Sequence, residues 1–261
     1  MKLHIKMTTL GKGGFGKAKK VIWHGKEAVV KYLNVNQDPI ATLATCTLNR
    51  NEAQKEGKIM SIFKNCDSIA LIYAVEGHAI YMKYYPDGSL RDQLDQGNVI
   101  EERYFMLDDI VAGLRQIHQL NFVHSDLKAA NILCEKHERI RCLITDFGAA
   151  AKKGTAPQCY TEGFAPPDFF NKPLCFEDDI YSLGKLCIEL FTGERDIRGI
   201  DYNNFYKKMN PLDFTNNKNA KNEPEHYRLE LMDLIHECLN PDSSKRPSLI
   251  DFFDFVSSYG F

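Results

Sequence analysis

Two features near the N-terminus are suited to binding phosphate. The stretch Gly11-Lys12-Gly13-Gly14-Phe15-Gly16 contains the pattern G-x-G-x-x-G. Glycines let backbone N–H groups approach phosphate oxygens because no side chain blocks them, and Phe15 would lie at the tip of the turn. Lys31 ends an apolar run, where its ammonium can point into a cleft toward phosphate oxygens. A plain glycine-rich turn and an ordinary surface lysine are the alternatives for each feature taken alone.

The neighbouring sequence decides between two unrelated nucleotide sites that share this glycine pattern. A dinucleotide-binding fold needs a helix after the glycines and an acidic residue about 20 positions further on. Here residues 17–33 alternate as two short strands around the turn at His24 and Gly25, and position 31 is a lysine. The pattern therefore favours a β-hairpin that covers phosphates.

An acidic side chain on the following helix would hold the Lys31 ammonium in place. Glu56 is the better candidate, because Ile59, Met60 and Phe63 follow it at helical spacing. Glu52 lacks that pattern and stays the alternative.

A polar stretch in the middle of the chain supplies a second set of reactive groups. It reads His124-Ser125-Asp126-Leu127-Lys128-Ala129-Ala130-Asn131, and Asp146-Phe147-Gly148 follows behind an apolar run. A single Asp or Asn is most often a turn residue. The joint spacing of these residues favours a functional site. Three later motifs follow: Pro166-Pro167-Asp168, Asp179 to Gly184, and Arg246-Pro247. With these motifs the sequence resembles the eukaryotic protein kinase family over essentially the whole chain.

The resemblance implies transfer of the γ-phosphate of ATP to a protein. By similarity, Asp126 accepts the proton of the substrate hydroxyl and Lys128 neutralises charge on the γ-phosphate. Asn131 and Asp146 would bind Mg²⁺, with Mn²⁺ as an alternative. Lys31, paired with Glu56, would hold the α- and β-phosphates.

The resemblance also implies a nucleotide pocket. Ala18, Val29 and Leu133 would cover the adenine ring, with Met82 at the back. Ala18 replaces the valine usual in the family, and the lost methyl contacts would weaken nucleotide binding by about 1 kcal/mol. The phosphates and the adenine edge would meet backbone groups of the glycine loop and of the segment after Met82: Gly11, Gly13, Phe15, Gly16, Lys83 and Tyr85.

Two residues favour serine and threonine as acceptors, since Lys128 and Thr161 stand where kinases of this class carry them. Ser125 replaces the arginine that binds an activation-loop phosphate in many kinases. We therefore predict activity without a phosphate on Thr155, the most plausible modified residue between Asp146 and Asp168.

Three packing contacts follow from the same resemblance. Arg246 is predicted to pair with Asp168, although the shorter aspartate replaces the family's usual glutamate. Phe147 is predicted to pack between Met60 and His124, and His124 to serve packing and hydrogen bonding rather than proton transfer.

Two other functions fit the same fold. A pseudokinase would bind nucleotide or partners as a scaffold without phosphate transfer, but such proteins typically lack at least one of Lys31, Asp126, Asn131 and Asp146, all of which are present. A small-molecule kinase, such as those that modify aminoglycosides or choline, would not need the peptide-binding motifs around Thr161 and Asp168.

The pattern of expected strands and helices, together with the resemblance, predicts an α+β, bilobal, protein kinase-like fold in one catalytic domain. Residues 1–85 would form a small, mainly antiparallel β lobe with one key helix, and residues 86–261 a larger helical lobe. Strands are predicted over residues 19–23, 27–33, 69–75 and 78–84, and helices over 48–63, from 90 after the cap Ser89, and over 101–120, 180–191 and 228–239. Residues 201–226, rich in Asn and Lys, predict an exposed insertion.

Composition bounds the location and partners of the chain. With Lys+Arg 33 against Asp+Glu 35, the charge balance argues against a dedicated nucleic-acid binder. Apolar runs are too short for a membrane helix, and the first residues show no signal sequence. The 8 cysteines form no C-x-x-C pair and predict reduced core residues, hence a cytoplasmic protein. Protein substrates are expected as partners. Control is expected from a regulatory partner, from the insertion rich in Asn and Lys or from expression, and the oligomeric state is left open.

Overall fold

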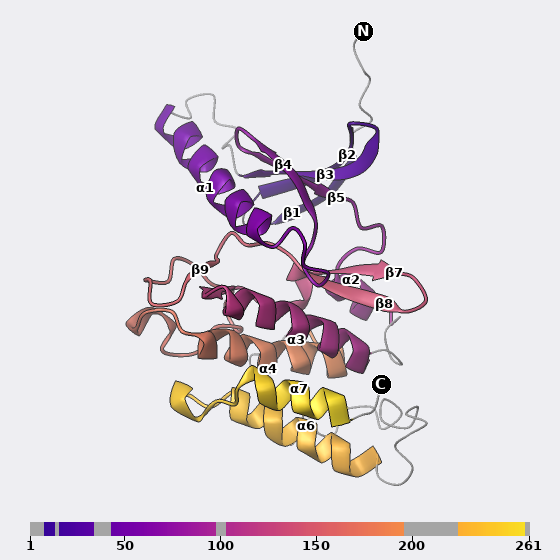
Figure 1. Ribbon diagram of the computed structural model, residues 1–261, viewed down its shortest axis with the longest axis vertical. Helices are drawn as coiled ribbons and strands as arrows, with labels where there is room; N and C mark the ends of the chain where they lie inside the picture. The colour runs from indigo at the N-terminus through magenta and orange to yellow at the C-terminus, as the bar shows by residue number, and fades with distance from the viewer. Residues whose placement is uncertain (1–7, 14–15, 34–42, 98–102, 196–223, 259–261) are drawn as a thin grey trace.

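The computed structural model describes residues 8–13, 16–33, 43–97, 103–195 and 224–258. A small β lobe carrying one long helix lies above a larger, mainly helical lobe (Figure 1). The predicted bilobal α+β arrangement is confirmed. Phe15 and most of the predicted insertion lie outside the described residues, and residues 224–226 begin helix α6 instead.

The small lobe is built on one antiparallel sheet of five strands in the order β1-β2-β3-β5-β4. The predicted hairpin is formed by β2 and β3, and its turn residues His24 and Gly25 both adopt positive φ, as a tight two-residue turn requires. The strand bounds are β1 Thr8–Gly13, β2 Gly16–Trp23, β3 Lys26–Leu33, β4 Ile72–Glu76 and β5 Ala79–Lys83.

Helix α1, Leu43–Ile62, begins before the predicted residue 48 and packs on the sheet through a very close approach to β4. A Cβ added at Gly57 would lie 2.1 Å from Cγ2 of Val75. Only a residue without a side chain allows this approach. Ala53 and Met60 are fully buried on the same side of the helix.

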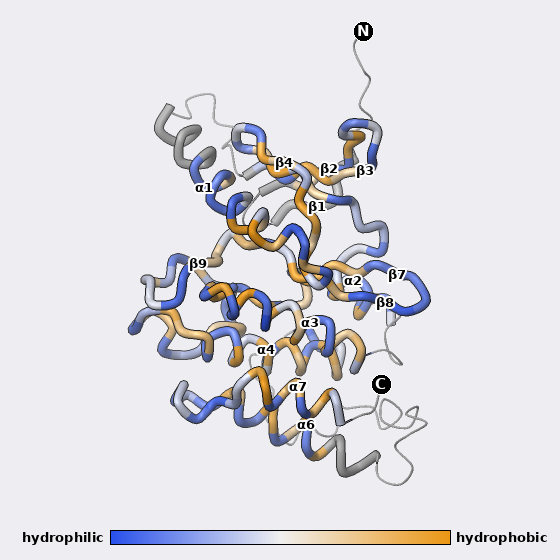
Figure 2. The backbone as a smooth tube through the Cα atoms, in the orientation of Figure 1, coloured by the Kyte–Doolittle hydropathy of each residue, from blue (hydrophilic) through white to orange (hydrophobic). Residues whose placement is uncertain are grey.

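The large lobe is organised around the buried helix α4, which is apolar nearly all round as predicted. Its helices are α2 Leu90–Asp95, α3 Arg103–Gln119, α4 Phe176–Thr192, α6 Pro224–Cys238 and α7 Leu249–Ser258. Short strands complete it: β6 Phe122–Val123, β7 Ile132–Lys136, β8 Ile140–Ile144 and β9 Ala151–Lys152. Hydrophobic segments of α3 and α4 face each other inside this lobe (Figure 2).

Two further predictions concern the ends of elements, namely the cap of α2 and the start of β4. Ser89 caps α2 with a reciprocal capping box to Asp92, as expected for a helix that starts at Leu90. Strand β4 starts at Ile72 rather than at residue 69, because Ile69 instead forms a parallel bridge with Ile144 of β8. This bridge joins a residue of the small lobe to a strand of the large lobe.

The cysteines whose side chains are described are free, as predicted, but only part of them lie in the core. Buried are Cys134, Cys142, Cys187 and Cys238, and half-buried are Cys66, Cys159 and Cys175. Among the described residues, no helix combines the length and the apolar character needed to cross a membrane.

Candidate active site

Asp126 lies at the centre of a closed network of polar side chains. Its Oδ1 accepts the Thr161 hydroxyl at 2.5 Å, and its Oδ2 accepts the Lys128 ammonium and the Asn131 amide, both at 2.8 Å. Lys128 also donates to Thr161 at 2.5 Å. The carboxylate is 2% exposed and fixed by three donors, so its direction is set before any substrate binds.

The loop that carries Asp126 is fastened to α4 by a buried carboxylate. Asp179 accepts the backbone N–H groups of His124 at 2.8 Å and Ser125 at 2.9 Å, and its Oδ2 lies 2.8 Å from Nε2 of His118. Burial opposes the charged form, but His118 and these donors outweigh it and lower the pKa of Asp179. Ser125 adopts φ 68°, a left-handed conformation that the fastened loop maintains.

A second acidic residue of α4 supports the same loop. Glu189 accepts the backbone N–H of Ala129 at 2.9 Å through Oε2, and its Oε1 lies 3.4 Å from the guanidinium of Arg91. Burial raises the pKa of Glu189 despite these contacts. The sequence did not point to this residue; its signal is a buried glutamate near the end of the mostly apolar run 180–191.

Asp146 brings the two lobes together. Its Oδ1 accepts the Lys31 ammonium from β3 at 2.7 Å, and its backbone adopts φ 63°. Burial alone would favour the neutral acid, but Lys31, His124 and the Gly148 N–H lower the pKa of Asp146. The residue is therefore an anion at the boundary between the lobes.

Lys31 pairs with Glu56 of α1, not with Glu52, which lies exposed on the same helix. The Lys31 Nζ donates to Oε1 of Glu56 at 2.8 Å. Burial lowers and the two carboxylates raise the pKa of Lys31, with a net increase. Glu56 is 2% exposed, and its Oε2 has no hydrogen-bond partner among the described residues. Burial consequently raises the pKa of Glu56.

Phe147 packs between the lobes. The His124 ring meets it edge-on at 5.1 Å between centroids, as expected. The ring of Phe63, the residue after α1, also stacks on it at 5.4 Å, a contact that the sequence did not predict. Met60 is buried in the same core cluster as Phe147.

The predicted nucleotide-binding residues lie on neighbouring strands. Val29 of β3 is opposite Met82 of β5, and Ala18 of β2 is opposite Lys31. Leu133 comes from β7 in the other lobe, so the predicted covers of the adenine ring come from both lobes. In the glycine loop, Gly13 is opposite Gly16, and Gly11 is opposite Ala18.

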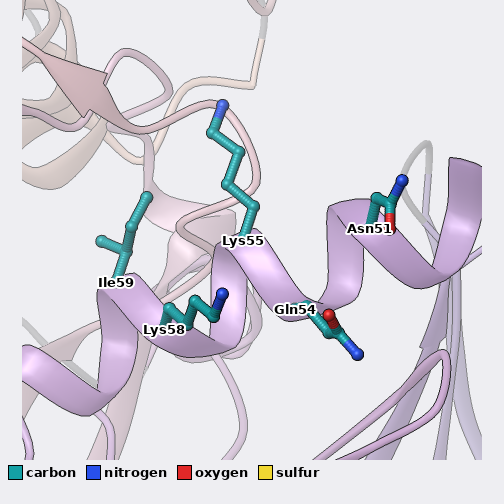
Figure 3. A pocket seen from close by; sticks show the side chains of 5 residues that line it. All are labelled: Asn51, Gln54, Lys55, Lys58 and Ile59. Atoms are coloured by element: carbon teal, nitrogen blue, oxygen red, sulfur yellow. The ribbon is translucent and has the colours of Figure 1, made fainter.

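The segment between Asp146 and Asp168 touches α1 at a place the sequence did not predict. Lys55, next to Glu56, donates to the side chain of Gln158 at 2.9 Å. A cavity of about 400 Å³ lies along this helix (Figure 3), lined by Asn51, Gln54, Lys55, Lys58 and Ile59. The cavity is on α1 rather than between the predicted nucleotide-binding strands.

The predicted ion pair of Arg246 with Asp168 is present at 3.7 Å and is loose. Arg246 donates at shorter distances to the carbonyl oxygens of Glu177 and Asn240, at 2.8 and 2.9 Å. The side chain of Asp168 is too short to replace these acceptors.

The residues predicted to bind a divalent cation fit that role. The Asn131 amide nitrogen donates to the carbonyl and to Oδ2 of Asp126, which turns the amide oxygen away from these partners. With the Asp146 carboxylate it offers two protein oxygens. No cluster of three or more His, Cys, Asp or Glu suited to a metal occurs in the described part of the chain. Mg²⁺ in nucleotide sites commonly takes one or two protein oxygens, and phosphates and water supply the others.

The comparisons with known proteins agree with this geometry. The family model for the protein kinase domain matches residues 4–255. The chain belongs to the protein kinase family.

Individual relatives are distant and much longer. A probable serine/threonine-protein kinase of Dictyostelium discoideum is 26% identical over 263 residues, which cover 95% of this chain and 19% of the relative. Dual specificity protein kinase shkB of the same organism is 28% identical over 260 residues, 93% of this chain and 38% of its own. Serine/threonine-protein kinase SMU1 of Mycosarcoma maydis is 26% identical over 264 residues, 95% and 33%. The chain spans less than half the length of these relatives.

Proposed function

We propose that this kinase domain transfers the γ-phosphate of ATP to serine or threonine hydroxyls of proteins. The observation that carries the proposal is the fixed carboxylate of Asp126, which Lys128, Asn131 and Thr161 hold together. Phosphoryl transfer needs positioning and charge stabilisation more than covalent participation by the enzyme, and this network supplies both.

Each side chain then has a task. Asp126 orients the acceptor hydroxyl and takes its proton, while Lys128 stabilises negative charge on the transferred group. Lys31 binds the α- and β-phosphates, and Glu56 keeps its ammonium in place. Asn131 and Asp146 would hold Mg²⁺ or Mn²⁺, which when bound neutralises charge on the phosphates.

The acceptor class rests on the contact between Lys128 and Thr161, which closes the site beside Asp126. Relatives named as serine/threonine kinases support the assignment, and one relative named as dual specificity makes tyrosine an acceptor to be tested alongside. Phosphoamino-acid analysis of the product separates these acceptors.

We further propose that the domain works without a phosphate on its own segment. Ser125, the residue before Asp126, has no positive charge to bind one, and Thr155 already donates its hydroxyl to the Lys152 carbonyl at 2.7 Å. The free cysteines favour a reducing compartment such as the cytoplasm.

The direct test measures transfer of labelled γ-phosphate from Mg-ATP to a generic basic protein and to the enzyme itself. We expect label on serine or threonine that is lost in Asp126→Asn, with ATP binding kept. Binding of ATP without transfer by the wild type would instead support a scaffold. Transfer by Asp126→Asn at the wild-type rate would refute the role of this carboxylate.

A further inference from the structure

The segment that connects the lobes is held by a side chain with no role in the proposed chemistry. Tyr85 is 5% exposed, and its hydroxyl accepts the backbone N–H of Leu71 at 3.0 Å. The backbone N–H of Lys83 donates to the carbonyl of the same Leu71 at 2.9 Å. Both backbone groups of Leu71 are therefore used to fix residues 83–85.

This arrangement replaces one bond of a regular ladder. Ile72 is opposite Met82 in the antiparallel pair β4–β5, so Leu71 falls opposite Lys83. Two residues that form a hydrogen-bonded pair in such a ladder exchange both bonds. Here only the bond from Lys83 to Leu71 is made by the backbone, and the phenolic oxygen accepts the return N–H.

Because the Tyr85 hydroxyl accepts the Leu71 N–H, the carbonyl of Lys83 lacks the partner that a regular ladder would give it. A regular ladder would direct the Leu71 N–H to that carbonyl, and the Tyr85 hydroxyl takes its place. The Lys83 carbonyl is thus spared for an acceptor role toward a group outside the sheet. In the proposed function, that group is the amino group of adenine.

We propose that Tyr85 is a positioning residue for nucleotide binding, whose hydroxyl occupies the Leu71 N–H and so keeps the Lys83 carbonyl free for adenine. The inference rests on the proposed function, because it takes the adenine to lie against this segment.

The ring of Tyr85 is also held from the large lobe. The Lys83 ammonium lies 5.1 Å from the ring centroid and forms an ion pair with Glu135 of β7. Burial raises the pKa of Tyr85 to about 12, so the hydroxyl stays neutral and able to accept at physiological pH. The ring therefore contacts a lysine that Glu135 of β7 holds in place.

The test compares Tyr85→Phe with the matched change Tyr81→Phe. Both keep the ring, and Tyr81 stacks on Trp23 on the side of the sheet away from the main core. The probes are a fluorescent ATP analogue for affinity, and ATP against purine riboside triphosphate, which lacks the 6-amino group. Melting temperatures report folding.

For Tyr85→Phe we expect affinity for the ATP analogue to fall about fivefold, as loss of one hydrogen-bond acceptor predicts. We also expect the preference for ATP over the 6-deamino nucleotide to shrink, with a larger rise in KM for ATP than fall in kcat. Tyr81→Phe should match the wild type. A loss of stability or of saturated rate with unchanged nucleotide preference would overturn the inference, as would wild-type affinity. If the wild type bound no nucleotide, the proposed function would fail first, and this inference with it.

Discussion

The two sides of the candidate site are held in different ways. On the large-lobe side, Asp179 and Glu189 bind three backbone N–H groups of the loop that carries Asp126, and both acids are buried in α4. On the small-lobe side, the Lys31–Glu56 pair depends on where a single helix lies against the sheet. The first side is therefore fixed by buried groups of the large lobe, whereas we expect that the second can be displaced while the fold persists.

The largest effect should come from Asp146→Asn, which removes the anion at the boundary of the lobes. Phosphate transfer should fall on the order of 10³-fold, because the proposed cation-binding oxygen and a partner of Lys31 are weakened together. The free energy of unfolding should fall by less than in Asp179→Asn, because the Asp146 side chain is partly exposed and Glu56 still pairs with Lys31. Radiolabel transfer measures the activity of the variant, and urea unfolding measures its stability. A loss of transfer that the unfolded fraction of the variant fully explains would show that the two sides do not differ in this way.

Asp179→Asn should instead act through the fold. Removing the buried charge that accepts two backbone N–H groups should lower the free energy of unfolding by about 3 kcal/mol. Because the pKa of Asp179 lies below its ordinary value of 3.8 in the folded protein, its stabilisation is complete above about pH 4 and is lost as pH falls through the folded-state pKa.

Urea unfolding from pH 7 to pH 3 measures this dependence. The wild type should lose more stability than Asp179→Asn over the acid range. Parallel curves for the two proteins would show that Asp179 does not fasten the loop as an anion.

Thr161 tests how the fixed side is held, because its hydroxyl bonds to Asp126 and Lys128 from a separate segment of the chain. Thr161→Val should reduce transfer about tenfold by freeing Asp126 and Lys128, whereas Thr161→Ser keeps the hydroxyl and should retain most activity. The ratio of the two rates at saturating ATP measures the hydroxyl contribution. Equal rates for Val and Ser would show that methyl packing, not hydrogen bonding, matters there.

The reactive residues of both sides could be predicted from sequence, whereas Glu189, which supports the fixed side, could not. Asp126, Lys128, Asn131 and Asp146 lie at short spacing in one ordered set of motifs, so their identity could be predicted and the fold brings them together. Glu56 was distinguishable from Glu52 because the apolar residues after it have helical spacing. Periodicity fixes which face of a helix is buried.

The start of one helix and the contacts between distant segments were less predictable, for physical reasons. The start of α1 was predicted five residues late, because Thr45, Cys46 and Thr47 have weak helix propensity and give no apolar period. The bond from Leu71 to Tyr85 and that from Lys55 to Gln158 depend on how separate elements pack. No local pattern encodes which partner a side chain reaches across a fold.

We expect the position of α1 to set activity separately from folding, and two matched Gly→Ala variants separate the two effects. A Cβ at Gly57 would press on Val75 and displace α1, whereas a Cβ at Gly184 would lie 2.6 Å from Cβ of Cys238 between α4 and α6, away from the site. Overpacking should cost each protein about 1–3 kcal/mol of stability.

The measurement is the transfer rate per folded molecule at saturating ATP and substrate, at a temperature where both variants are folded. We predict a loss of about tenfold or more for Gly57→Ala, because its effect reaches Glu56 and Lys31, and a wild-type rate for Gly184→Ala. Equal rates for the two variants, at comparable stability, would show that the position of α1 does not set activity separately from folding.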